Sequence, residues 1–212
     1  MNTIARNTFG ITPKWDTPSG HSPVTDFAKM IYPISEELVE HIDKSTFKLS
    51  IKKGKHLLKA DEICQYVYFI QKGVLRAYVR DATKEITTWI TAENEMVTSI
   101  YGFDLQRPAT ENIQAIEDCQ LVAFHYDDLQ FAYNNFIEMN IVGRKLLEQY
   151  YRDAEERAYI SRLAKASSRY NHFIETKGAL ANRIQLKYIA SYLGMTIETL
   201  SRIRSKMHEL PH

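Results

Sequence analysis

The spacing of the apolar residues changes close to His125. Between residue 49 and that point, short apolar or alternating runs are separated by segments containing Gly, Asp and Lys, which is typical of β-strands joined by tight turns. The runs lie at 66–70, 74–79, 86–90, 112–116 and 120–124. Strands this short and regular predict a β-roll of the jelly-roll kind. After His125 the apolar residues recur every three or four positions, which predicts helices and therefore an α+β fold.

An amphipathic helix is expected ahead of the roll, within residues 26–48. Ser35 is placed to cap its first turn, and its apolar face would be Leu38, Val39 and Ile42. The stretch before it, residues 1–25, is rich in Gly, Pro, Ser and Thr and is expected to form a flexible arm. It lacks the apolar core of a secretory signal.

Composition excludes several classes of protein. No apolar run approaches the ~18 residues that a membrane span requires. Cys64 and Cys119 lie too far apart for a Cys-x-x-Cys motif, so no disulfide scaffold, zinc ribbon or iron–sulfur site is expected. The sequence contains no nucleophile motif, Gly-rich phosphate loop or metal-ligand pattern. We therefore expect a cytoplasmic, reduced protein that is not an enzyme and holds no metal.

Charge is divided unevenly along the chain. Residues 141–212 contain thirteen Lys and Arg against seven Asp and Glu, which gives 13 − 7 = +6. The whole chain has a net charge of +1, so residues 1–140 carry +1 − 6 = −5. This asymmetry indicates that the C-terminal third meets an anionic partner.

A short helix is expected at 127–135 and a long one at 137–163. The long helix carries a stripe at alternating steps of three and four: Ile137, Asn140, Arg144, Leu147, Tyr151, Ala154, Ala158 and Ser161. An apolar or small stripe with charged flanks fits a seam between two copies of the helix, formed mainly by Leu147, Tyr151, Ala154 and Ala158. Packing of the helix on its own domain is the alternative.

Residues 186–206, LKYIASYLGMTIETLSRIRSK, read as two short helices joined by a tight turn. Gly194 is suited to end the first helix in a left-handed conformation, and Thr196 is a good cap for the second. Leu200, Ile203 and Met207 are expected to form the buried face of the second helix. The pattern predicts a helix-turn-helix, with an ordinary helical hairpin as the alternative.

The other face of that second helix has the chemistry to read DNA. Arg202 can donate two hydrogen bonds to guanine, and Glu198 can accept one from cytosine, so both can serve one G·C pair. Ile197 offers an apolar surface to a thymine methyl group, and Ser201 can donate or accept. The predicted phosphate contacts are Gln185, Lys187, Thr196 and Lys206.

Two simpler roles for Glu198 stay open at this level. An acid in the first turn of a helix is favoured by the helix dipole. Glu198 could also pair with Arg202 at i+4 on the solvated surface, which is worth ~0.3–0.5 kcal/mol.

The order of acidic β-roll, long helix and helix-turn-helix resembles the Crp/Fnr family of bacterial transcription regulators over roughly 28–207. The phrase KKGKHLLKADEICQYVYFIQKGVLRAYVRD resembles the cyclic-nucleotide-binding-type roll of that family. Asp61 and Asn94 stand where the roll often has glycine, and both residue types tolerate a left-handed backbone. The segment IETLSRI resembles the Fnr-like reading set, Glu-x-x-Ser-Arg, at Glu198, Ser201 and Arg202.

The resemblance implies a division of the chain into four parts: an arm at 1–25, an effector roll at 26–136, a dimerisation helix at 137–163 and a DNA-binding domain at 164–212. It further implies a homodimer that binds double-stranded DNA at a palindrome, with half-sites similar to TTGA and RNA polymerase as a possible further partner. Only MHELPH follows Lys206, so the usual β-hairpin wing is expected to be truncated or absent.

The chain departs from the family in the segment that binds cyclic AMP. Thr98 and Ser99 occupy the positions of the family's Gly-Glu pair, and Ala109 occupies that of its phosphate-binding arginine. A buried phosphate without a cation would be poorly compensated, so cyclic AMP is not expected to be the effector. Arg107 could restore the charge if the loop is shifted.

Any effector pocket is expected at Trp89, Thr98, Ser99, Arg107 and Thr110, although the aromatic residues of this region could equally belong to the core. No cofactor is expected, because the N-terminal arm has no cysteine cluster and no histidine is placed as a haem ligand. The alternative function is a small-molecule-binding module with a degenerate DNA domain.

Overall fold

The computed structural model describes residues 15–209. Its roll consists of two antiparallel four-stranded sheets. The first has the order β1 (Thr46–Ile51), β8 (Cys119–His125), β3 (Tyr66–Lys72) and β6 (Met96–Val97). The second has the order β2 (His56–Leu58), β7 (Asn112–Ala115), β4 (Leu75–Asp81) and β5 (Lys84–Thr91). The five runs identified in the sequence correspond to β3, β4, β5, β7 and β8, so the predicted β-roll and the α+β class are confirmed.

The turns of the roll depend on left-handed backbone at a few residues. Asp61 and Asn94 have φ angles of 70° and 65°, so the prediction that they replace glycine in these turns is confirmed. Gly73, between β3 and β4, has a φ of +103°. A Cβ atom there would lie 2.6 Å from the Cys119 Sγ atom, so this position requires glycine.

Two helices precede the roll where the sequence predicted one. Helix α1 spans Pro23–Ile31 and α2 spans Glu36–Ser45. The backbone between them is extended at Tyr32 and Ser35, and the Ser35 side chain accepts a hydrogen bond from the Leu38 amide as the predicted cap. The predicted helix, with its apolar face at Leu38, Val39 and Ile42, is therefore confirmed as α2. Helix α1 was not predicted, and Pro33, which has no amide hydrogen, separates it from α2.

Residues 15–25 are held against α2, contrary to the prediction of a flexible arm over 1–25. The Trp15 side chain is buried, and its Nε1 donates to the Asp43 carbonyl oxygen at 3.0 Å. The Asp43 carboxylate accepts hydrogen bonds from the Ser22 amide at 2.8 Å and the Thr25 hydroxyl. The three partners lie 18 to 28 residues before Asp43 in the sequence. Residues 1–14 lie outside the described part of the chain.

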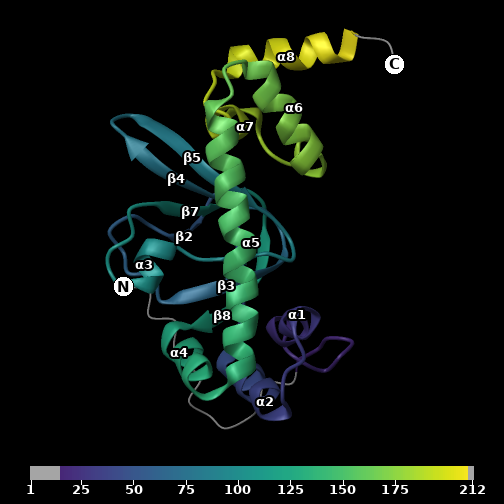
Figure 1. Cartoon of the computed structure of the whole chain (residues 1–212). Coiled ribbons are helices and arrows are strands. Elements are labelled where there is room, and N and C mark those ends of the chain that lie inside the picture. The colour runs from purple at the N-terminus through teal and green to yellow at the C-terminus, as the bar shows by residue number, and fades with distance from the viewer. Residues whose placement is uncertain (1–14, 210–212) are drawn as a thin grey trace.

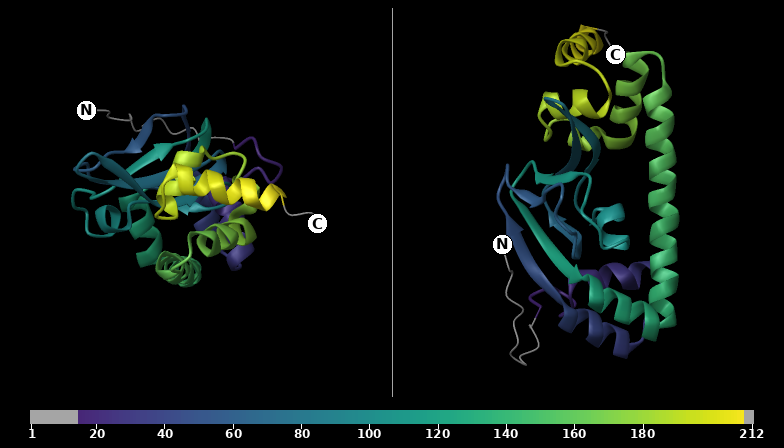
Figure 2. Two further views of the ribbon diagram at one scale, coloured as in Figure 1. Left: turned by 90° about the horizontal axis from the view of Figure 1, so that it is seen from above. Right: turned by 90° about the vertical axis from the view of Figure 1, so that its left-hand side faces the viewer.

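Helix α5 (Ile137–Arg162) follows α4 (Tyr126–Asn135) and runs along the whole molecule beside the roll (Figure 1). Helices α1, α2 and α4 lie at one end of α5, and the C-terminal helices lie at the other (Figure 2). The buried residues of α5 are Met139, Val142, Gly143 and Ile160. No helix within residues 15–209 is long and apolar enough to cross a membrane.

The C-terminal unit contains α6 (Ala166–Lys177), a 3-10 turn at Gly178–Leu180, α7 (Leu186–Tyr192) and α8 (Ile197–Glu209). Its apolar core is continuous with roll residues. Val74, Ile90 and Ile116 of the roll belong to the same buried cluster as Phe173 and Ile189. The C-terminal unit is therefore docked on the roll.

Candidate nucleic-acid interface

The turn between α7 and α8 has the local geometry that its sequence predicts. Gly194 adopts a left-handed φ of 62°. The Met195 amide donates to the Ala190 carbonyl oxygen at 3.0 Å, which closes the end of α7. The Thr196 hydroxyl accepts from the Thr199 amide at 3.2 Å and caps α8. These contacts set the direction in which α8 leaves the turn.

Helix α8 has one face in the core and one in solvent. Leu200 is fully buried and Ile203 is half-buried, as predicted. Met207 is 41% exposed, so its assignment to the buried face is wrong. The physical reason is visible in Figure 1, where the C-terminal part of α8 extends beyond the helices that pack against its beginning.

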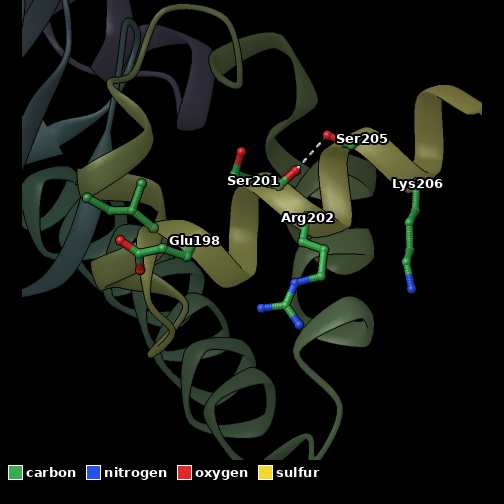
Figure 3. Close-up of a pocket in the computed structure, with 6 residues that line it drawn as sticks. Glu198, Ser201, Arg202, Ser205 and Lys206 are labelled. Atoms are coloured by element: carbon green, nitrogen blue, oxygen red, sulfur yellow. Dashed lines mark hydrogen bonds between the residues drawn. The ribbon is translucent and has the colours of Figure 1, made fainter.

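The predicted reading residues lie together on the exposed face of α8. A shallow, open depression is lined by Ile197, Glu198, Ser201, Arg202, Ser205 and Lys206. Figure 3 shows these side chains along one side of the helix, with the Ser205 hydroxyl donating to the Ser201 carbonyl oxygen at 3.2 Å. Ser205 was not assigned to the site from the sequence, although its spacing of four from Ser201 places it on the same face.

Glu198 is associated with the start of its helix rather than with Arg202. Its own amide and the Thr196 side chain hydrogen-bond its carboxylate, which lowers the pKa of Glu198. The side chains of Glu198 and Arg202 point in different directions (Figure 3). The simple surface pair considered above is therefore not formed, and both side chains can contact a ligand.

The predicted phosphate contacts are exposed and belong to both helices. Gln185 is the residue before α7, and Lys187 lies in its first turn, with Nζ 4.8 Å from the centroid of the Tyr188 ring. Thr196 caps α8, and Lys206 lies in its exposed C-terminal half.

The stripe of α5 is exposed along its whole length. All eight of its members are solvent-accessible, with Leu147 at 66% and Tyr151 at 67% exposure. Five of its members line the open cavity between α5 and the roll: Asn140, Arg144, Leu147, Tyr151 and Ala154. Within the described chain, no tight packing covers the stripe.

The roll contains a cavity of about 1170 Å³ beside α5. Trp89 and Thr98 line it, together with apolar side chains such as Phe27, Phe103 and Val142. Among the other predicted pocket residues, Ser99 is buried at the start of α3 (Ile100–Asp104), and Arg107 and Thr110 are exposed on the surface. Two of the five predicted pocket residues, Trp89 and Thr98, therefore line the cavity. No group of three or more His, Cys, Asp or Glu side chains in residues 15–209 is placed to hold a metal ion.

Comparisons with known proteins agree with this architecture. Residues 48–135 match the family model of the cyclic nucleotide-binding domain. The fold is similar to that of a transcriptional regulator of the Crp/Fnr family from Eubacterium rectale, with a TM-score of 0.67, 17% sequence identity, and coverage of 85% of this chain and 88% of the other. The chain therefore has the fold of the Crp/Fnr regulators, with a cyclic nucleotide-binding domain in its roll.

Other similar proteins cover both the roll and the C-terminal unit of this chain. The structure of FixK2 from Bradyrhizobium japonicum has a TM-score of 0.65 and 21% identity, covering 77% of this chain and 85% of that protein. The anaerobic regulatory protein of Haemophilus influenzae is 22% identical over 196 residues, covering 84% of this chain and 74% of the relative.

The segment 98–110, called the cassette below, stands where Crp/Fnr proteins bind cyclic AMP, and an acid that the sequence did not single out lies beside it. Burial raises the pKa of Glu111, while the neighbouring Ser99 and Trp89 side chains act in the opposite direction. Ala109, which stands in place of the family arginine, is buried at 2% exposure. The cassette therefore contains a buried methyl group and a neighbouring carboxyl group, and the exposed Arg107 does not line the cavity.

Proposed function

We propose that this Crp/Fnr-type regulator is a homodimer that binds a palindromic DNA sequence through α8 of each copy. The observation that carries the proposal is the exposed face of α8, where two cations, a carboxylate and two hydroxyls are grouped opposite the buried Leu200. This is the arrangement by which a recognition helix enters the major groove. The C-terminal third also carries the excess of positive charge that phosphate binding requires.

Each side chain of the reading face has a defined role in the proposal. Arg202 donates to the O6 and N7 atoms of guanine, and Glu198 accepts from the amino group of the paired cytosine. Ile197 contacts a thymine methyl group, and Ser201 donates or accepts beside it. By likeness to the Fnr-like set, the half-site resembles TTGA.

The proposed phosphate contacts are Gln185, Lys187, Thr196 and Lys206, which fix the register of α8 without reading sequence. They lie at the starts of α7 and α8 and along the exposed part of α8.

The dimer is proposed to form along the exposed stripe of α5. Leu147, Tyr151, Ala154 and Ala158 are spaced for packing between parallel helices. A two-fold axis along this seam would present two recognition helices to successive major grooves, about 34 Å apart.

Cyclic AMP is not the proposed effector of the roll. The buried phosphate of this ligand needs a cation, and the cassette has Ala109 in its place with the carboxyl group of Glu111 nearby. A ligand of other chemistry remains compatible with the cavity beside Trp89 and Thr98.

The test is selection of bound duplexes from a random DNA pool by the full-length protein, with and without cyclic AMP. We expect an enriched palindrome whose two half-sites are one helical turn apart, and the same enrichment in both arms. Failure to enrich any sequence would contradict the proposed DNA function. Enrichment only in the presence of cyclic AMP would contradict the proposal for the roll.

A further inference from the structure

The segment between the 3-10 turn and α7 carries an arginine that binds two acids of the roll. Arg183 donates through Nη1 and Nη2 to the two carboxylate oxygens of Glu93, at 2.9 and 2.7 Å. It also donates through Nε and Nη2 to the two carboxylate oxygens of Glu117, at 3.1 and 2.7 Å. We call this set of three residues the Arg183 clamp.

The acids of the clamp are themselves fixed to the roll. The Glu93 carboxylate also accepts from the Gly73 amide at 2.8 Å. Gly73 has a φ of +103°, and a Cβ atom there would lie within 3 Å of Cys119 and Asp118, so only glycine fits this position. The Arg183 guanidinium holds the pKa of Glu93 down at about 2. The clamp is therefore formed with charged partners at neutral pH.

Other contacts hold α7 against the β4–β5 hairpin. The Ser191 hydroxyl accepts from the Thr87 amide at 2.9 Å and donates to the Glu85 carbonyl oxygen at 2.9 Å. The Arg76 guanidinium lies 3.9 Å from the centroid of the Tyr188 ring. With Arg183 just before α7 and Ser191 near its end, the helix is tied to the roll at both ends.

The position of α7 determines that of α8. The two helices share the tight turn at Gly194 and the buried contact of Leu200 with the core. None of the hydrogen bonds described for the reading face in residues 15–209 reaches the roll, so the clamp holds α8 with this face free. A change in the docking of α7 would therefore rotate or shift the reading face as a unit.

We propose that Arg183 is a positioning residue for DNA recognition, which fixes the helix-turn-helix to its own roll and thereby sets the half-site spacing that the dimer accepts. This inference rests on the proposed function. The two recognition helices of a dimer can match half-sites one turn apart only if each holds a defined orientation relative to its seam. The guanidinium fork suits this role because it fixes two carboxylates in one geometry.

The clamp is better explained by positioning than by stability. Its side chains are 27–35% exposed, and ion pairs at this exposure contribute little to the stability of a fold. Arg183→Gln and the double variant Glu93→Gln/Glu117→Gln should therefore both fold. Lys52→Gln, which breaks an exposed ion pair within the roll, is the matched control.

The experiment measures the affinity of the full-length protein for a set of duplexes. Each carries the palindrome found by selection, with its half-sites moved apart or together by one or two base pairs, and one duplex carries a single half-site. The wild type and Lys52→Gln should prefer one spacing. The preference is the ratio of the affinity for the best spacing to the affinity for the other spacings. In both clamp variants this ratio should fall roughly threefold or more, while the affinity for the single half-site stays within about twofold of the wild type.

The outcomes separate this inference from the proposed function. If the wild type binds no palindrome, the proposed function fails, and the inference fails with it. If the wild type prefers one spacing and both clamp variants keep that preference, only the role of Arg183 is overturned. Arg183→Gln could instead weaken binding to every duplex equally while the double glutamate variant binds like the wild type. Arg183 would then be a phosphate contact, and the inference would be overturned. Tighter binding by the clamp variants would also overturn it, because the clamp would then oppose recognition.

Discussion

The Arg169 guanidinium of α6 donates through Nε to the carbonyl oxygen of Leu193 at 2.8 Å. Through Nη1 it also donates to the carbonyl oxygen of Leu163 at 2.6 Å. Leu193 is the C-cap of α7 and Leu163 is the C-cap of α5. One side chain therefore satisfies carbonyl groups at the ends of two helices and links them.

Removal of this side chain should destabilise the C-terminal unit. Arg169→Ala leaves two carbonyl groups without a charged donor, and we expect the free energy of unfolding to fall by about 1–3 kcal/mol. Denaturant unfolding followed by circular dichroism measures the change, and Arg169→Lys should recover part of it. An unchanged unfolding midpoint in Arg169→Ala would mean that water replaces the guanidinium at no cost.

Arg202→Ala should change the sequence preference of the protein. We expect a loss of about 1–3 kcal/mol in binding to the selected site, together with relaxed preference at one G·C position, because the bidentate contact to guanine is removed. Competition binding on duplexes substituted at each position measures both effects. The comparison variant Lys187→Ala should weaken binding to all sequences alike and reduce the salt dependence of binding. Preference retained at every position in Arg202→Ala would contradict the base-reading role.

Leu147→Glu should separate the proposed dimer. The side chain is 66% exposed on the stripe of α5, and a charge there would be buried against its counterpart in a parallel seam. Sedimentation equilibrium should show a dimer for the wild type and a monomer for the variant. Tyr159→Glu is a control on the same helix, since Tyr159 is 60% exposed but lies outside the stripe. A dimeric Leu147→Glu protein would place the interface elsewhere.

Glu111→Gln should stabilise the protein in a pH-dependent manner. Burial raises the pKa of Glu111 in the folded chain above its ordinary value of 4.5, so folding favours the protonated form. The wild type should therefore lose stability relative to Glu111→Gln as the pH rises above about 4.5, up to the pKa of the folded state. Below that window the two proteins should be equally stable.

Thermal unfolding between pH 4 and pH 8 would measure this difference. The exposed Glu175→Gln is the control, and it should follow the wild type across the range. If Glu111→Gln also followed the wild type, the carboxyl group would be better hydrated in the fold than its burial indicates.

The sequence was sufficient for features that rest on local chemistry. Gly194 and Thr196 define the helix-turn-helix because a left-handed residue and a side-chain cap act within one turn of the chain. Asp61 and Asn94 were identifiable as turn residues for the same reason. The alternating apolar pattern of the strands was enough to predict the β-roll, even though the pairing of the strands was unknown.

Features that depend on distant partners could not be obtained in this way. Trp15 is ordered by Asp43, and Arg183 meets acids 66 and 90 residues before it, so neither contact leaves a pattern in the neighbouring sequence. Met207 continues the apolar spacing of α8, but the spacing cannot show that the packed surface ends before it. Glu111 likewise acquires its environment from Ser99 and Trp89, on other segments of the roll.

Helix α5 connects the two ends of the molecule, so a small tilt at one end produces a larger displacement at the other. Its 26 residues, at ~1.5 Å each, span ~39 Å. A tilt of about 5° at the end near α4 would displace the other end by ~3.4 Å, which is the rise of one base pair. A small tilt about the buried Met139 and Val142 would therefore be enough to move a recognition helix by one step along DNA.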